Sequence, residues 1–283
     1  MNKLVISMNG LGDNVYQRGF IQSLVERGYK VWLTTPWPEV YRGLDIGFVK
    51  SDTKLRTQSK NQLRQPDSLW SKWPTDAEVL RVSYGSNLSR ANIIRLMEEC
   101  FGVPPAPMSL PPFESPIKGE YVVVRPVTVR SEWANSARNP YPEYIEHASN
   151  ELAKRGIQRI AVADLKPGKE WIVGNSALGD QCFYAGELGP EQLLGLIRGA
   201  KAVVGGVGWI LPTCLAYQTP LFCVLGGNGG HNHPSRITDS RLGLSKVRWA
   251  LPEKMCMCTS MSHKCDKTIT NFEWSFSHFL NTL

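Results

Sequence analysis

The sequence predicts an α/β protein of two domains, each built around a parallel sheet. An apolar strand at 4–8 runs into Asn9-Gly10-Leu11-Gly12-Asp13 and then into a helix-like segment. A similar unit recurs late in the chain, where a strand at 202–205 leads into a glycine-rich turn and a helix-like run to Tyr217. Strands that alternate with helices form parallel sheets with right-handed crossovers. Two such units far apart in one chain therefore indicate two nucleotide-fold domains.

The first half of the chain alternates between strand and helix patterns. The expected order is a strand at 4–8, a helix at about 14–27, strands at 29–34, 45–49 and 78–84, and an amphipathic helix at 90–101. Residues 103–112 are too rich in proline for a helix or an interior strand. This stretch is expected to be a semi-rigid linker between the domains.

The second half repeats the alternation. The expected elements are strands at 121–124, 159–163, 183–185, 202–205 and 221–225, and helices at 142–155, 190–198 and 210–217. The aromatic segment 268–283 is expected to form a terminal helix that packs back on the first domain. The expected domains are therefore 1–115 and 119–267, followed by the helix at 268–283.

Composition limits the compartment and the partners. The chain has 283 residues, a net charge of +7 and 42% hydrophobic residues. No apolar run is long enough to cross a bilayer, and no signal peptide is evident, so we expect a cytoplasmic protein. Seven cysteines without a secretion signal favour reduced thiols or a metal site over disulfides. The positive charge favours anionic partners, and the sequence does not indicate an oligomeric state.

A basic stretch between positions 50 and 64 carries part of the excess charge, with only Asp52 opposing it. One interpretation is a solvated loop. The other is a flap that binds an acidic acceptor, with Lys54, Arg56 and Lys60 as the contacting residues. The stretch has no interleaved aromatic residues, which disfavours a surface for single-stranded nucleic acid.

Asp13 stands where the first helix begins. Asp is a favoured N-cap residue, so one role is a plain helix cap. The alternative is a carboxylate aimed into a cleft, because the end of a strand beside a helix N-terminus is where α/β proteins hold ligands.

Two segments resemble those of heptosyltransferase-like glycosyltransferases. The turn Gly10-Leu11-Gly12-Asp13 resembles the glycine–x–glycine–aspartate turn of that family. The second match runs from Leu196 to Gly205 and resumes at Leu215-Ala216-Tyr217-Gln218-Thr219-Pro220, which is similar to the family's donor-site segment. With the linker between them, the two matches cover most of the chain in the family's order.

The resemblance implies a GT-B fold, with two facing Rossmann-like domains and a C-terminal helix that crosses back. It also implies an inverting glycosyltransferase that needs no cofactor for catalysis, with Asp13 as general base on the acceptor hydroxyl. The donor would be a nucleotide-sugar bound by the second domain. The anionic acceptor would be a bacterial surface glycan or lipid, and a modified nucleic-acid base would also suit a basic chain.

Charge on the leaving diphosphate needs cations or backbone N–H groups. The candidate donor-binding residues are Gly12, Arg130, Arg138, Gly205, Gly206, Val207, Gly208, Trp209, Gly227, Asn228 and His231. Arg130 and Arg138 follow the first strand of the second domain, where the family places a basic residue. Gly227, Asn228 and His231 belong to a glycine-rich loop that follows a strand. The alternative interpretation is a flexible loop that binds no ligand.

Cys256, Cys258, His263 and Cys265 form a C-x-C-x4-H-x-C pattern. Four such ligands within ten residues can make a tetrahedral zinc site. The one-residue spacing is tighter than usual, so a cluster of reduced thiols is the alternative. A bound metal would be structural and would hold the end of the chain in place.

Two other classes of function compete. In the donor turn, Val207-Gly208-Trp209 stands where the family carries an acidic or polar residue followed by Ser/Thr-Gly. This departure favours a nucleotide- or sugar-binding module of the same fold that has lost catalysis. An oxidoreductase of the Rossmann type is disfavoured, because it needs G-x-G-x-x-G and an acidic residue after the second strand. Here that strand ends in Thr34-Thr35-Pro36.

Overall fold

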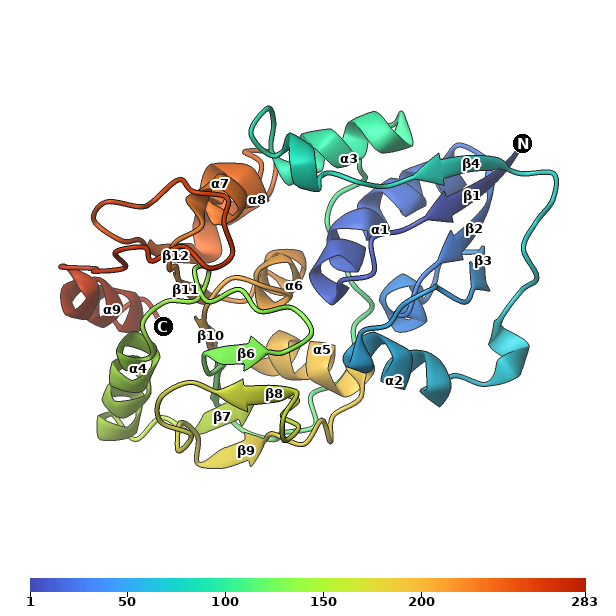
Figure 1. Ribbon diagram of the computed structural model, residues 1–283. Helices are drawn as coiled ribbons and strands as arrows, with labels where there is room; N and C mark the ends of the chain where they lie inside the picture. Colours follow the sequence, from blue (N-terminus) through green and yellow to red (C-terminus); the bar gives the residue numbers. More distant parts are fainter. The chain divides into compact units, whose positions relative to one another are not determined.

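The computed structural model describes residues 1–283, with the side chain of Ser86 outside the description. The chain divides into two compact units, Met1–Pro112 and Phe113–Leu283 (Figure 1). The division falls at the end of the proline-rich stretch. We describe each unit by itself.

The first unit contains a four-stranded parallel sheet in the order β3-β2-β1-β4. Its strands are β1 (Asn2–Ile6), β2 (Lys30–Thr34), β3 (Ile46–Val49) and β4 (Glu78–Arg81). Its helices are α1 (Leu11–Glu26), α2 (Arg56–Arg64) and α3 (Ile93–Phe101), with short 3-10 turns at Pro38–Tyr41, Asp67–Leu69 and Gly85–Asn87. α1 and α3 pack together, and the rings of Phe20 and Phe101 stack with centroids 4.9 Å apart.

The proline-rich stretch is docked on the first unit. Ala106 donates a backbone hydrogen bond of 3.0 Å to the carbonyl of Gly19, and a Cβ atom on Gly19 would lie 2.7 Å from the carbonyl oxygen of Ala106. Val103 and Leu110 are buried. Glycine in α1 therefore lets the stretch lie directly on the helix, so its first part belongs to the first unit.

The second unit is built on a six-stranded parallel sheet in the order β12-β11-β10-β5-β7-β9. These strands are β5 (Val122–Val124), β7 (Arg159–Val162), β9 (Gln181–Phe183), β10 (Ala202–Gly205), β11 (Leu221–Val224) and β12 (Val247–Ala250). A separate antiparallel pair joins β6 (Thr128–Arg130) to β8 (Glu170–Ile172). The helices are α4 (Pro142–Lys154), α5 (Pro190–Gly199), α6 (Ile210–Tyr217), α7 (Gly229–Asn232), α8 (Pro234–Ile237) and α9 (Phe272–Leu280), with a 3-10 turn at Leu244–Lys246.

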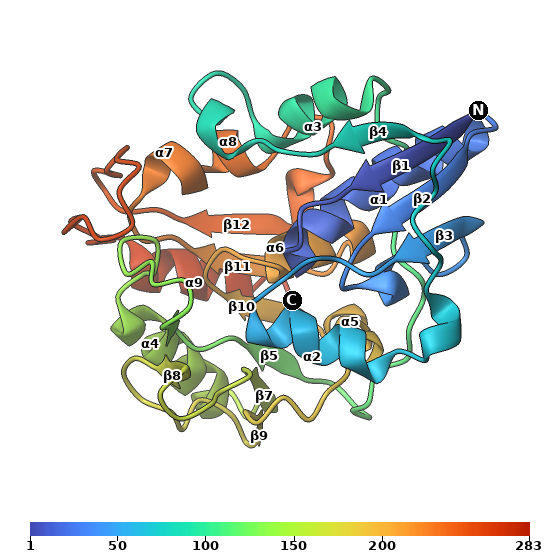
Figure 2. The same cartoon turned by 45° about the vertical axis from the view of Figure 1, so that its right-hand side comes forward.

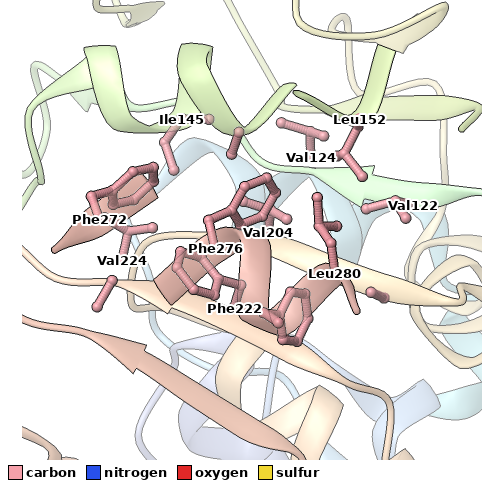
Figure 3. Packing of buried hydrophobic residues seen from close by; sticks show 14 of the residues in the cluster. Val122, Val124, Ile145, Leu152, Val204, Phe222, Val224, Phe272, Phe276 and Leu280 are labelled. Carbon is pink, nitrogen blue, oxygen red and sulfur yellow. The ribbon is translucent and has the colours of Figure 1, made fainter. Parts of the chain in front are cut away.

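One face of this sheet is covered by α4 and α9, which lie side by side in both views (Figures 1 and 2). Successive strand residues point to opposite faces, so Val122, Val204 and Phe222 share this face with the apolar residues of the two helices. Figure 3 shows Ile145 and Leu152 of α4 and Phe272, Phe276 and Leu280 of α9 packed on the strands. Each fully buried side chain of this size contributes roughly 1.5–3 kcal/mol.

The apolar face of the terminal helix is buried inside the second unit. The ring centroid of Phe222 in β11 lies 4.9 Å from that of Phe276 and 5.3 Å from that of Phe279. The β11–β12 connection carries only short helices, so α9 covers apolar strand residues that would otherwise face water.

Several elements lie where no regular structure was expected. α2 falls in the basic stretch interpreted as a loop or flap. It is anchored by polar contacts, because the Asn61 amide donates to the Pro36 carbonyl at 2.7 Å and the Gln62 side chain bonds Ser51. Periodicity of apolar residues could not reveal such a helix. β6, β8 and β12 are too short to stand out from their surroundings. Among the described residues, no helix is long and apolar enough to cross a membrane.

Candidate functional site

Asp13 lies in the first turn of α1, directly after β1. The helix begins at Leu11 with Gly10 in the N-cap position, so Asp13 is not the N-cap. Its carboxylate accepts a hydrogen bond from the hydroxyl of Tyr84. A Cβ atom on Gly10 would clash with the other carboxylate oxygen. Glycine at this position therefore makes room for the carboxylate, which the positive end of the helix dipole favours in its charged form. Gly12 precedes it, with its backbone N–H at the helix start.

Asn14 fixes the turn that carries Asp13. It is fully buried, and its amide donates hydrogen bonds of 2.8 Å to the carbonyls of Met8 and Gly10. Its oxygen accepts hydrogen bonds from Thr35 at 2.6 Å and Tyr41 at 3.0 Å. Every polar group of this buried amide is thus satisfied inside the unit. These buried hydrogen bonds of Asn14 fix the orientation of the first turn of α1.

The basic residues expected to bind an acceptor lie at α2. Lys54 is exposed before the helix, and Arg56 and Lys60 are half-buried on it. Arg56 and Lys60 are four residues apart, so they share one face of the helix. Lys50, from the same basic stretch, is paired with Asp67 at 3.0 Å.

Three arginines converge in the second unit. Arg125 follows β5, Arg130 ends β6, and Arg138 precedes α4. A Cβ atom placed on Gly208 would lie 3.4 Å from a terminal nitrogen of Arg125 and 3.5 Å from one of Arg138. Burial and the positive charges of Arg130 and Arg138 lower the pKa of Arg125 to about 10. The guanidinium groups of Arg130 and Arg138 therefore lie close enough to disfavour charge on Arg125.

One carboxylate partly balances this cluster. Glu170 is 4% exposed, and its Oε2 lies 3.0 Å from Nε of Arg130. The two residues are also paired in the β6–β8 ladder. Three arginines and a buried carboxylate thus lie together next to the Gly208 turn. Such a place is suited to an anion with more than one negative charge.

The arginines lie where α/β sheets bind ligands. From β5 the strands continue to β7 and β9 on one side, and the chain then returns to β10 on the other side. The strand order therefore reverses between β5 and β10. Ligands of open α/β sheets bind outside the carboxyl ends of the strands at this switch point. Arg125 follows one of the two strands, and Gly205 ends the other.

The turn after β10 is shaped by its glycines. Cβ atoms on Gly205 would lie 2.9 Å from Cβ of Arg125 and from Cδ1 of Ile210. Gly208 has a backbone φ of +153°, a conformation that residues other than glycine rarely adopt. Val207 is buried and Trp209 half-buried at the start of α6. The turn brings backbone N–H groups of a helix start beside the arginines, an arrangement that binds phosphate.

The glycine-rich loop after β11 is hydrogen-bonded to other segments of the second unit. Gly227 donates a 2.8 Å backbone hydrogen bond to Ala137, and Gly229 donates one of 2.8 Å to Cys256. Asn228 is fully buried, and its side chain bonds the carbonyl of Ser260 and the amide of Asn232. Gly227 and Asn228, which were expected to contact a donor, thus make hydrogen bonds inside the unit, while His231 lies half-buried in α7.

Cys256, Cys258, His263 and Cys265 come together as their spacing predicts, with ligand atoms all within 4.8 Å of one another. The sulfurs of Cys258 and Cys265 lie 3.5 Å apart, and Nδ1 of His263 lies 3.3 Å from the sulfur of Cys265. Tetrahedral coordination at about 2.3 Å places sulfurs roughly 3.8 Å apart. Three thiol groups and an imidazole in this arrangement fit zinc or iron.

Sequence reasoning missed Arg125, Glu170 and Trp133. Trp133 is 45% exposed, and its ring lies 5.3 Å from the guanidinium carbon of Arg138. Arg125 carried a usable signal, because it follows the first strand of the unit at the sheet edge that binds ligands. Glu170 carried none, since its role depends on the β6–β8 pairing.

The fold is that of heptosyltransferase-like glycosyltransferases. Among solved structures, the iron-containing dodecameric glycosyltransferase TibC from enterotoxigenic E. coli H10407 is 14% identical, with a TM-score of 0.66 over 99% of this chain and 77% of TibC. The glycosyl transferase family 9 structure from Veillonella parvula DSM 2008 is 9% identical, with a TM-score of 0.63 over 100% of this chain and 98% of that one. The E. coli ADP-heptose LPS heptosyltransferase II is 14% identical, with a TM-score of 0.52 over 98% and 99%. No family model matches the chain, and the search of curated proteins found no match.

Proposed function

We propose that this protein is an inverting glycosyltransferase whose second unit binds the nucleoside diphosphate of a nucleotide-sugar. The observation that carries the proposal is the convergence of Arg125, Arg130 and Arg138 beside the glycine turn at the switch point. A nucleoside diphosphate leaves with its charge spread over two phosphates. Cations and backbone N–H groups placed before the reaction stabilise that developing charge.

Asp13 is the general base of this proposal. Direct displacement at the anomeric carbon needs a base on the acceptor hydroxyl and no protein nucleophile. The carboxylate of Asp13 is held by Tyr84 and by the Asn14-anchored turn. A fixed carboxylate of this kind can take the proton as the hydroxyl attacks, which inverts the configuration of the sugar.

The donor and the acceptor are proposed by class. TibC has been solved in complex with ADP-D-β-D-heptose, with 16% identity to this chain and a TM-score of 0.58 over 100% of this chain and 77% of TibC. ADP-heptose is therefore the first donor to test. The cations of α2, Arg56 and Lys60, favour an anionic acceptor. A phosphorylated glycolipid and DNA with hydroxylated bases are the two acceptors of this class to compare.

We assign the Cys/His cluster to a structural metal, with zinc as the first candidate and iron as the second, since TibC contains iron. Four protein ligands complete a tetrahedral site, whereas catalytic zinc sites keep one position open for water or substrate. The metal would contribute the folding energy of the segment that holds it.

The second candidate is a nucleotide- or sugar-binding module without catalysis. It is favoured by Val207, which is buried in the donor turn and offers no side-chain hydrogen bond to a phosphate or sugar. Both candidates predict nucleotide binding, and only the enzyme predicts release of the diphosphate.

Calorimetric titration with ADP, UDP, GDP and CDP tests the donor site. We expect one of them to bind the wild type, and Arg138→Gln and Arg125→Gln each to raise Kd about tenfold or more, as for charge-assisted contacts. Arg155→Gln is the matched control, because Arg155 is exposed at the end of α4 and should leave Kd unchanged. The proposal fails if no diphosphate binds the wild type, or if both arginine variants bind as tightly as it does.

A further inference from the structure

The segment that carries the Cys/His cluster also contacts the loop that carries Arg138. We call residues 255–267 the cluster segment. It follows β12 and lies beside α7 (Figure 1). The loop at 135–139 connects β6 to α4 and contains Arg138. These two segments are far apart in sequence, so the contacts between them are tertiary contacts within the second unit.

Two direct hydrogen bonds join the segments. The backbone N–H of Ala137 donates to the carbonyl of Met261 at 3.0 Å. The ammonium of Lys267 donates to the carbonyl of Ser136 at 2.7 Å and lies 5.7 Å from the ring centre of Tyr141. Both bonds reach the two residues that precede Arg138. The backbone position of this arginine is therefore set in part by the cluster segment.

An indirect contact runs through Gly227. Its N–H donates to the carbonyl of Ala137 at 2.8 Å, and a Cβ atom on it would clash with the sulfur of Cys265. Gly226 packs equally closely on the carbonyl of Asn139. Gly226 and Gly227 thus contact the residues on either side of Arg138, Ala137 and Asn139, and Gly227 also contacts Cys265. Displacement of Cys265 would be transmitted to the arginine loop by contact.

We propose that the cluster segment positions Arg138, and that metal occupancy of the cluster sets the affinity of the unit for a nucleoside diphosphate. The inference rests on the proposed donor site. A metal would hold four side chains of the segment at one point, whereas without it hydrogen bonds and the packing of Cys265 on Gly227 keep the mostly exposed segment in place. Because coupling between two sites is reciprocal, nucleotide binding also strengthens metal retention. Lys267 is a positioning residue in this scheme and does not touch the nucleotide.

The test measures nucleotide affinity, metal content and backbone protection together. Lys267→Met keeps the apolar stem and removes the bond to Ser136. Lys264→Met is the matched control, because Lys264 is exposed in the same segment. We expect Lys267→Met to keep its metal and to raise Kd for the tightest of ADP, UDP, GDP and CDP by about 5-fold or more, within the usual range of coupling. Wild type stripped with a chelator should lose affinity to at least the same degree.

Hydrogen exchange supplies a readout that needs no nucleotide. Amides at 135–141 should exchange faster in the Lys267→Met and stripped proteins than in the Lys264→Met protein. The inference is overturned if Kd stays within about twofold of wild type in both, a change too small for a coupled site. If wild type binds none of the four diphosphates, the proposed donor site fails as well, which is a different outcome.

Discussion

The hydroxyl of Tyr84 donates a hydrogen bond to Oδ1 of Asp13. Tyr84 follows β4 and Asp13 follows β1, and these two strands are neighbours in the sheet. The carboxyl ends of two parallel strands thus bring an acid and a phenol together. The bond gives the carboxylate a fixed orientation in the ligand-free protein, as a general base requires.

Asp13→Asn should abolish most of the activity without unfolding the protein. The amide keeps the size of the side chain and an oxygen that can accept from Tyr84, but it is not a base. We expect the transfer rate to fall by about 10²–10⁴-fold and the melting temperature to change little. An Asn variant that turns over within a few-fold of wild type would exclude Asp13 as the base.

Tyr84→Phe separates orientation from basicity. The base remains, but it loses the hydrogen bond that directs it. We expect kcat/KM to fall about tenfold, as for one bond to a charged group, which is less than for Asp13→Asn. Equal losses in the two variants would mean that the phenol itself takes part in proton transfer.

Donor affinity should fall at high pH through Arg125. Burial and its arginine neighbours lower the pKa of Arg125 to about 10. The charged form binds the diphosphate, so the contribution of Arg125 is complete well below that pH and is lost as the pH rises through it. Wild type should therefore weaken between about pH 9 and about pH 10.5, and Arg125→Gln should weaken less over the same window. Parallel slopes would assign the loss to other groups.

The same depressed pKa predicts an effect on stability. The lowered pKa means that charge on Arg125 is disfavoured in the folded protein, so its free-energy cost is fully present below about pH 10 and falls as the pH rises above the lowered pKa toward the ordinary range of a guanidinium. Arg125→Gln should accordingly raise the melting temperature of the ligand-free protein at neutral pH. A lower melting temperature would show that its packing outweighs its charge.

Phe276 should be essential to the second unit. It is 1% exposed and packs on Phe222 from α9. Phe276→Ala should cost about 3–5 kcal/mol of unfolding free energy in urea. Trp274 lies on the same helix but is 65% exposed, so Trp274→Ala should cost less than about 1 kcal/mol. Similar losses for both would contradict the placement of α9.

Protein purified without chelator should carry about one equivalent of metal per chain. Cys265→Ser should remove it, and Gly227→Ala should lower it, because the new Cβ would clash with the sulfur of Cys265. Cys182→Ser is the control, since Cys182 is exposed outside the cluster. Elemental analysis decides the matter, and a wild type that holds less than a few tenths of an equivalent would leave only a thiol cluster.

Local patterns predicted what is local in this fold. The β1–α1 turn with Asp13 and the glycine turn after β10 lie where the sequence placed them, because glycine spacing and strand–helix alternation are read over a few residues. The Cys/His cluster is equally local. By contrast, the aromatic face of α9 indicates that the helix is docked but does not identify the surface, which in the second unit includes Phe222 of β11.

The arginine cluster shows what a linear pattern cannot give. Arg130 and Arg138 were expected from their place after a strand, and Arg125 directly follows the same strand. Their position beside the turn after β10 depends instead on the strand order, which places β10 next to β5. The buried Glu170 depends on a two-stranded pairing that apolar alternation does not signal. α2 was missed for a related reason, since the buried side chains that hold it, Gln58 and Asn61, are polar.

Release of nucleoside diphosphate from a nucleotide-sugar tests the central claim most directly. Wild type and Asp13→Asn would each be incubated with one donor at a time, ADP-heptose or a common UDP-, GDP- or CDP-sugar. Each donor would be tested with three acceptor conditions: a phosphorylated glycolipid, hydroxymethylated DNA, and no acceptor. The account predicts release by the wild type that depends on one acceptor and is lost in Asp13→Asn, with inverted anomeric configuration in the product. Tight binding of a nucleotide-sugar without release under any of these conditions would contradict it and would identify a binding module.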